Sequence, residues 1–153
     1  MGNICRSPTA HGVFESHVKS EQLSNFIEVD SAGTHSYHIG EKPDRRSQET
    51  AQENGIDLNY IRSRQVVSND FSYYDYILAM DNDNYALLEQ ACPEEYKNKI
   101  ALFLEYAPTY LSKEVPDPYY GGTNGFDNVF AMVDSASIGL LEALKKDWIN
   151  LKD

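Results

Sequence analysis

Residues 1–8 read MGNICRSP, and this stretch decides how the rest of the chain is interpreted. Ser7 followed by Pro8 is typical of a helix start, because serine caps helix N-termini well and proline fits the first turn. The turn from Gly2 to Arg6 would point backbone N–H groups at an anion, and Arg6 adds a planar fork of donors suited to phosphate. We therefore predict a phosphate cradle that runs into a helix. A capped surface helix with an unrelated arginine is the alternative.

The composition predicts one domain, residues 1–153, with a single core. The net charge of −11 argues against a nucleic-acid partner, because such partners are bound through basic patches. No apolar run approaches the roughly 20 residues of a membrane span, and no basic-then-apolar signal segment begins the chain, so no membrane partner is expected. Two cysteines, Cys5 and Cys92, make no disulfide framework and favour a cytoplasmic location.

Strand and helix patterns alternate along the chain and predict an α/β fold with a parallel sheet. Residues with helical apolar spacing are separated by short β-prone or continuously apolar runs, and Gly55 is expected to end the second helix. The predicted helices cover 8–23, 47–54, a segment from Asp81 or Asn82 to Cys92, and 126–151; the predicted strands cover 26–30, 74–80 and 100–104. We interpret the apolar stripe of the last helix as core, with a partner-binding face as the alternative.

A second motif, VPDPYYGG at residues 115–122, holds an acidic residue on a stiff loop. Pro116 and Pro118 flank Asp117 and restrict the backbone on both sides of it. A general acid needs such a fixed position, because it must reach the leaving oxygen by a hydrogen bond. Seen alone, the motif is also compatible with an ordinary proline-rich turn.

Together the two motifs resemble the low-molecular-weight protein tyrosine phosphatases. GNICRSPTA is similar to that family's phosphate-binding loop, and DPYYG is similar to its general-acid loop. The family signature places its nucleophilic cysteine six positions before the arginine, which is one residue before Met1. Cys5 instead matches the second loop cysteine. We therefore expect an N-terminally truncated chain that lacks the first strand and the nucleophile, rather than a natural pseudoenzyme.

The resemblance implies a mechanism without a metal or any other cofactor. The absent cysteine would attack phosphorus, Asp117 would protonate the leaving tyrosyl oxygen, and Arg6 with the loop N–H groups would bind the equatorial oxygens. The phosphate-binding loop would comprise Gly2, Asn3, Ile4, Cys5, Arg6 and Ser7, the last of which would steady the thiolate. Phosphotyrosine proteins are the implied partners, and phosphate, sulfate or vanadate the implied site ligands.

Supporting residues follow from the same resemblance. Asn3 matches an asparagine that props the loop, and Ser31 matches its hydrogen-bond partner, although a plain turn at Ser31 is the alternative. The family also has a histidine in this network, and the corresponding residues 59–62 contain none. The aromatic walls of the substrate slot would be Tyr37, Tyr119 and Tyr120.

The resemblance also implies the architecture and the alternatives. The family fold has three layers, α/β/α, around a four-stranded parallel sheet, and its first strand would be missing here. An open sheet edge predicts a homodimer or a local distortion that fills the gap. Ile4 goes with phosphotyrosine, whereas phosphoarginine relatives carry threonine there. A non-catalytic phosphate binder and an arsenate reductase, for which Cys92 beside Pro93 is a poor match, are the remaining alternatives.

Overall fold

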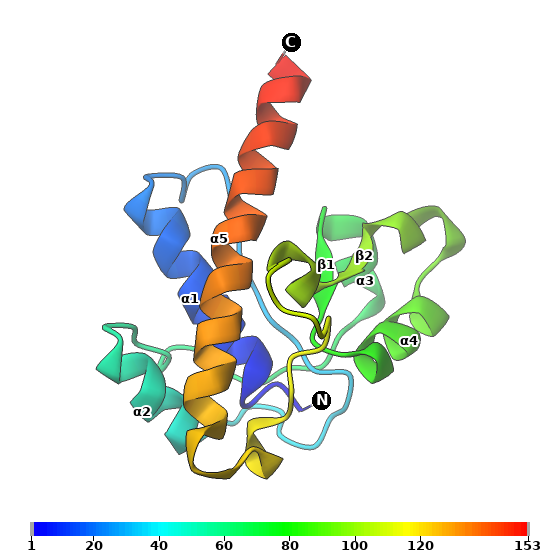
Figure 1. Ribbon diagram of the computed structural model, residues 1–153. Helices are drawn as coiled ribbons and strands as arrows, with labels where there is room; N and C mark the ends of the chain where they lie inside the picture. The colour runs from blue at the N-terminus through cyan, green and yellow to red at the C-terminus, as the bar shows by residue number, and fades with distance from the viewer. Residues whose placement is uncertain (1, 153) are drawn as a thin grey trace.

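The computed structural model describes residues 2–152, and the side chains of residues 2–148 (Figure 1). Helices α1 and α5 lie side by side on one side of a small parallel sheet, and α3 and α4 lie on the other. The regular elements are α1 (Arg6–Ser20), α2 (Arg45–Glu53), α3 (Ser68–Tyr73), β1 (Ile77–Ala79), α4 (Asn82–Ala91), β2 (Ile100–Leu102) and α5 (Gly125–Lys152). Short 3₁₀ turns connect them: η1 (Glu94–Lys99), η2 (Phe103–Tyr106), η3 (Pro118–Tyr120) and η4 (Gly122–Asn124).

The sheet consists of β1 and β2, which pair in parallel with Ile77 opposite Ile100 and Ala79 opposite Leu102. The predicted α/β fold with a parallel sheet is confirmed. Both strands fall inside the apolar runs that predicted them and are shorter than those runs. A parallel connection needs a crossover, and α4 with η1 supplies it.

The predicted strand at residues 26–30 is wrong for the described structure. Phe26 and Ile27 both donate their backbone N–H to the carbonyl of Leu23, which makes a turn. The chain then runs without regular structure until Gly33, which forms an isolated bridge with Gln65. An extended segment becomes a strand only when a partner strand completes its hydrogen bonds, and within residues 2–152 this segment has none beside it.

Helices α1 and α5 form the main core. Val13 and Val18 of α1 are buried against the apolar stripe of α5, which includes Val133 and Leu140. The prediction that this stripe is core therefore holds for its middle part, whereas Trp148 at its end is 38% exposed. Gly139 lets α5 approach η2 closely, because a Cβ atom there would lie 1.9 Å from the carbonyl oxygen of Tyr106.

The helix ends show which local rules operate. Asp81, one of the two predicted starts of this helix, caps α4 by accepting the N–H of Asn84 at 2.8 Å. Gly55 follows α2 with φ of 79°, the left-handed conformation that glycine tolerates best. Ser7 does not cap α1: the helix begins at Arg6, directly after Cys5, and the Ser7 hydroxyl donates to Asn3 Oδ1 instead. None of the helices within residues 2–152 combines the length and apolar character that crossing a membrane requires.

Candidate active site

The loop from Gly2 to Cys5 curves around the N-terminus of α1 and is fixed by neighbours far away in the sequence. Ser63 Oγ donates to the carbonyl of Gly2 at 2.6 Å, and the backbone N–H of Asp44 donates to the carbonyl of Ile4 at 2.6 Å. Because these carbonyls are held outward, the loop N–H groups and the positive end of α1 are free to face an anion.

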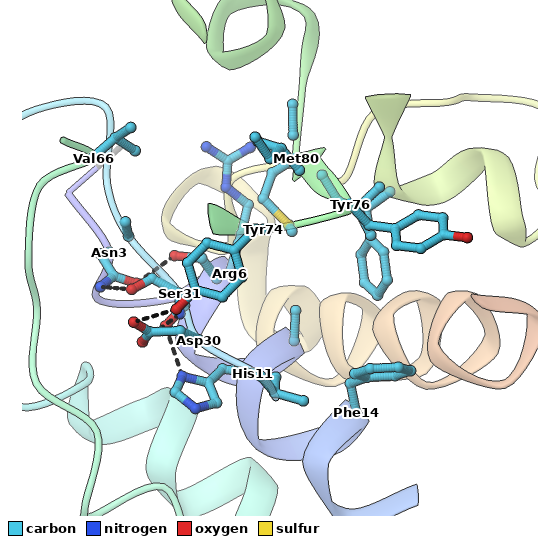
Figure 2. A pocket seen from close by; sticks show the side chains of 18 of the residues that line it. Asn3, Arg6, His11, Phe14, Asp30, Ser31, Val66, Tyr74, Tyr76 and Met80 are labelled. Atoms are coloured by element: carbon cyan, nitrogen blue, oxygen red, sulfur yellow. Dashed lines mark hydrogen bonds between the residues drawn. The ribbon is translucent and has the colours of Figure 1, made fainter. Parts of the chain in front are cut away.

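Asn3 is the turning point of this loop. Its φ of 62° is left-handed, a conformation that is uncommon for any residue except glycine, and its side chain is 2% exposed. The Ser7 hydroxyl donates to Asn3 Oδ1 at 2.6 Å, and Asn3 Nδ2 donates to the backbone carbonyl of Ser31 at 3.3 Å. Ser31 Oγ in turn lies 2.9 Å from His11 Nδ1 (Figure 2). The predicted Asn3–Ser31 contact is thus present, through the main chain of Ser31.

Arg6 is buried beneath the loop. Its Nη1 donates to Asp81 Oδ2 at 2.7 Å and to the carbonyl of Val115 at 2.8 Å. Burial alone would raise the pKa of Asp81, but the Asn84 N–H and the Arg6 guanidinium outweigh it and hold that pKa below its ordinary value. Asp81 therefore stays ionised and fixes one side of the guanidinium fork.

Asp117 lies on the rim of the same site. Its side chain accepts the N–H of Tyr119 at 2.9 Å and so caps the short turn η3, as the flanking prolines predict for a stiff loop. Tyr119 and Tyr120 follow it with exposed rings. Tyr37, also exposed, stacks on His35 with ring centroids 5.2 Å apart. All three tyrosine rings are thus exposed, and Tyr119 and Tyr120 directly follow Asp117 in the chain.

Arg46 of α2 packs against Tyr119 at the rim of the site. Its guanidinium carbon lies 4.3 Å from the centre of the Tyr119 ring and 4.7 Å from that of Phe126, within the range of cation–π contacts. Asp44 accepts hydrogen bonds from the backbone and the side chain of Arg46. This contact fixes the position of one aromatic wall.

The two cysteines are poor nucleophiles. Burial, followed by the nearby carboxylates Asp44 and Asp117, raises the pKa of Cys5 to about 11, although Ser47 and Arg46 act in the opposite sense. Cys92 is buried at the end of α4, and burial raises the pKa of its thiol as well. At neutral pH both are thiols, and a thiol does not attack phosphorus effectively.

The loop, Arg6, Asp117 and the three tyrosines all line one cavity of about 970 Å³. One end is polar, with Asn3, Ser31 and His11, and the rings of Phe14 and Tyr76 lie toward the other end (Figure 2). The apolar part is bordered by β1 and by residues 26–31. Within residues 2–152, no cluster of three or more His, Cys, Asp or Glu side chains is arranged to hold a metal ion.

Two residues of the site are missed by the sequence reasoning. Asp81 is expected only as a possible start of a helix, yet it contacts Arg6. Its place directly after a parallel strand is the available signal, since ligand sites gather at such strand ends. His11 stands four residues after Ser7 on the same helix face, and that spacing is the signal that could have identified it.

An α/β fold with an anion-binding loop, a buried arginine at a helix N-terminus and a carboxylate on an adjacent rim defines the class of phosphate-handling α/β proteins. The comparisons with known proteins then specify the family. Residues 1–150 match the family described as low molecular weight phosphotyrosine protein phosphatase, and the chain belongs to this family.

Curated relatives and solved structures agree with that assignment. The chain is 41% identical over 151 residues to a putative low molecular weight protein-tyrosine-phosphatase of Synechocystis. The matched region covers 98% of this chain and 96% of the relative. The chain is 39% identical to the low molecular weight phosphotyrosine protein phosphatase of Schizosaccharomyces pombe, covering 94% and 92%. A crystal structure of a protein tyrosine phosphatase from Entamoeba histolytica, with Hepes in its active site, has a TM-score of 0.92 and 43% identity, covering 96% and 94%.

These matches do not support the expected N-terminal truncation, since the family match begins at residue 1. The relatives bear the name of protein tyrosine phosphatases, so the expected enzyme class is confirmed at the level of the family.

Proposed function

We propose that this protein is a phosphotyrosine phosphatase whose loop Gly2–Ser7 and Arg6 bind the phosphoryl group and whose Asp117 acts as general acid. One observation carries the proposal: Arg6 at the helix N-terminus and Asp117 on its rigid turn line the same cavity, which exposed tyrosine rings also line. Nη1 of Arg6 is held by Asp81 and Val115, and the other donors of the guanidinium would bind two equatorial phosphate oxygens.

The substrate class follows from the walls of the site. Tyr37, Tyr119 and Tyr120 offer flat aromatic surfaces suited to the phenyl ring of phosphotyrosine. Free phosphate, sulfate and vanadate would occupy the loop alone, as tetrahedral anions do at helix N-termini. Two free cysteines support the reducing cytoplasm as the compartment of this single-domain protein.

The chemical step has two stages. In the mechanism that the family resemblance implies, a cysteine thiolate would attack phosphorus, the bond from phosphorus to the tyrosyl oxygen would break, and Asp117 would give that oxygen its proton. Asp117 would then take a proton from the water that hydrolyses the phosphocysteine. Because Cys5 has a pKa near 11 and Cys92 is buried, neither supplies the thiolate. We therefore propose that these 153 residues, taken alone, bind phosphate without turning over a phosphomonoester.

The first experiment measures hydrolysis of p-nitrophenyl phosphate by the 153-residue chain and by its Cys5→Ser variant, together with binding of inorganic phosphate by calorimetry. We expect binding without turnover, and loss of binding in Arg6→Lys, because a point charge cannot replace the planar fork. Turnover that is lost in Cys5→Ser would show that Cys5 is the nucleophile, and would refute the proposal that the 153 residues do not turn over a phosphomonoester. Absence of phosphate binding by the wild-type chain would refute the proposal that the loop Gly2–Ser7 binds phosphate.

A gain-of-function experiment tests the acid. An apolar strand ending in cysteine, joined directly ahead of Met1, would place a thiol at the loop, and the apolar part of the cavity beside β1 leaves room for the strand. In that form Asp117→Ala should slow phosphotyrosine hydrolysis by roughly 10²–10⁴-fold and spare p-nitrophenyl phosphate, whose leaving group needs less protonation. Equal losses on both substrates would remove Asp117 from this role. Light scattering of the 153-residue chain tests the alternative that a second copy covers this edge.

A further inference from the structure

The shape of the phosphate-binding loop depends on Asn3, whose backbone conformation is energetically unfavourable. Asn3 is buried and left-handed, and such a backbone persists only where the surroundings hold it. Two hydrogen bonds do so: Ser7 donates to its side-chain oxygen, and its side-chain nitrogen donates to the carbonyl of Ser31. The hydrogen bond from Asn3 Nδ2 to the Ser31 carbonyl is long, at 3.3 Å, so its strength depends on the exact position of Ser31.

Ser31 lies in a segment without regular structure, and its side chain is held by His11. His11 Nδ1 is 2.9 Å from Ser31 Oγ. His11 belongs to α1, the same helix whose first turn contains Ser7 and whose N-terminus is surrounded by the phosphate-binding loop. One rigid helix thus contacts Asn3 twice, directly through Ser7 and indirectly through His11 and Ser31. The segment of Ser31 is tied to the cradle by this histidine.

The imidazole itself is fixed by its surroundings. His11 is 9% exposed; the Tyr60 ring meets it edge-on with centroids 5.9 Å apart, and Glu15 lies 3.6 Å from Nε2. Tyr60 Oη donates to Glu15 at 2.9 Å, which closes the cluster behind the ring. Burial lowers the pKa of His11, against the opposing effects of Glu15 and Asp30 and with a smaller contribution from Arg64, so the neutral ring prevails at neutral pH.

A neutral imidazole has one donor and one acceptor. The Glu15 carboxylate, 3.6 Å from Nε2, favours the tautomer with its proton on Nε2, and Nδ1 then accepts a hydrogen bond from the Ser31 hydroxyl. We propose that His11 is a positioning residue of the phosphate-binding loop, which holds Ser31 and, through it, the left-handed turn at Asn3. The inference rests on the proposed phosphate-binding function. In residues 59–62, where the family resemblance places a network histidine, this chain has Tyr60, and Tyr60 packs against His11.

The test measures the affinity of the 153-residue chain for inorganic phosphate by calorimetry, with thermal unfolding alongside. His11→Leu removes the acceptor and should weaken phosphate binding about fivefold, the scale of one hydrogen bond. His11→Asn keeps an acceptor where Nδ1 stands and should bind within about twofold of wild type. Ser31→Ala should match His11→Leu, and the double variant should be no weaker than either single variant, as expected of residues acting through one contact.

His17 provides a matched control on the same helix. Its Nε2 pairs with Asp134 of α5 at 2.7 Å, away from the loop, so His17→Leu should leave phosphate affinity unchanged. Equal weakening in His11→Leu and His17→Leu would show a general loss of the fold and overturn the inference, as would unchanged binding in His11→Leu or loss in His11→Asn. A wild-type chain that binds no phosphate would overturn the proposed function and this inference together. If the wild type binds phosphate and only Arg6→Lys loses it, while the His11 and Ser31 variants bind as the wild type does, the inference alone would be overturned.

Discussion

Replacing Asp81 by asparagine isolates the charge that holds Arg6. At 2.7 Å and an effective dielectric constant of 20, the gross attraction is about 6 kcal/mol, and the two side chains are 7% and 19% exposed. Removing one member of a buried pair typically costs about 3–5 kcal/mol. Asparagine still caps α4 and still offers Arg6 an oxygen, and Val115 keeps its bond, so we expect a loss of about 2–3 kcal/mol. Asp81→Ala should lose about 1 kcal/mol more with the cap.

Guanidinium denaturation at several pH values checks this expectation. The folded pKa of Asp81 lies below its ordinary 3.8, so its contribution to stability is present above that value and disappears as the pH falls through the folded pKa. The stability difference between wild type and Asp81→Asn should therefore be full at pH 7 and shrink below about pH 4. Asp134→Asn, which breaks the more exposed pair with His17, should cost under about 1 kcal/mol. A difference for Asp81→Asn that is absent at pH 7, or that persists unchanged at pH 2.5 (about 1 unit below an ordinary carboxyl), would refute the reasoning.

Two further predictions concern packing and thiol reactivity. Gly139→Ala should destabilise the protein by about 2 kcal/mol in chemical denaturation, because the new Cβ would meet the Tyr106 carbonyl oxygen at 1.9 Å and overpacking outweighs the gain of about 1 kcal/mol in helix propensity; a more stable variant would contradict this packing. Cys5 should react with iodoacetamide at pH 7 about a hundredfold more slowly than a free thiol, because its pKa is about 11 rather than 9.0. Mass spectrometry of the alkylated protein follows the reaction, and alkylation at the rate of free cysteine would contradict the raised pKa.

Local rules account for the parts of the fold that were predicted correctly. Asp81 caps α4 because a short acidic side chain can reach the N–H two or three residues on, and Gly55 follows α2 because it accepts a left-handed backbone. Such effects act within one helical turn and are visible in the sequence. Helix α3, Ser68–Tyr73, escaped prediction because six residues are too few to show a period.

The predictions that were wrong concern residues whose contacts lie far away in the sequence. Residues 26–30 have the composition of a strand but no neighbour to pair with among the described residues, and Ser7 uses its hydroxyl on Asn3 rather than on its own helix. The contact of Arg6 with Asp81 joins residues 75 positions apart, which no spacing rule anticipates. Resemblance to a family named Arg6 and Asp117, whereas the folded chain shows that Asp81 holds Arg6 and that His11 contacts Ser31.

The position of β1 has a consequence for how water reaches the backbone. Within the described residues β1 pairs along one edge with β2, and its residues border the large cavity. Because successive N–H groups of a strand point to opposite edges, neighbouring amides of β1 should exchange with deuterated water at very different rates. The N–H groups of β1 that point away from β2 should thus take up deuterium faster than their immediate neighbours, although they belong to a regular strand.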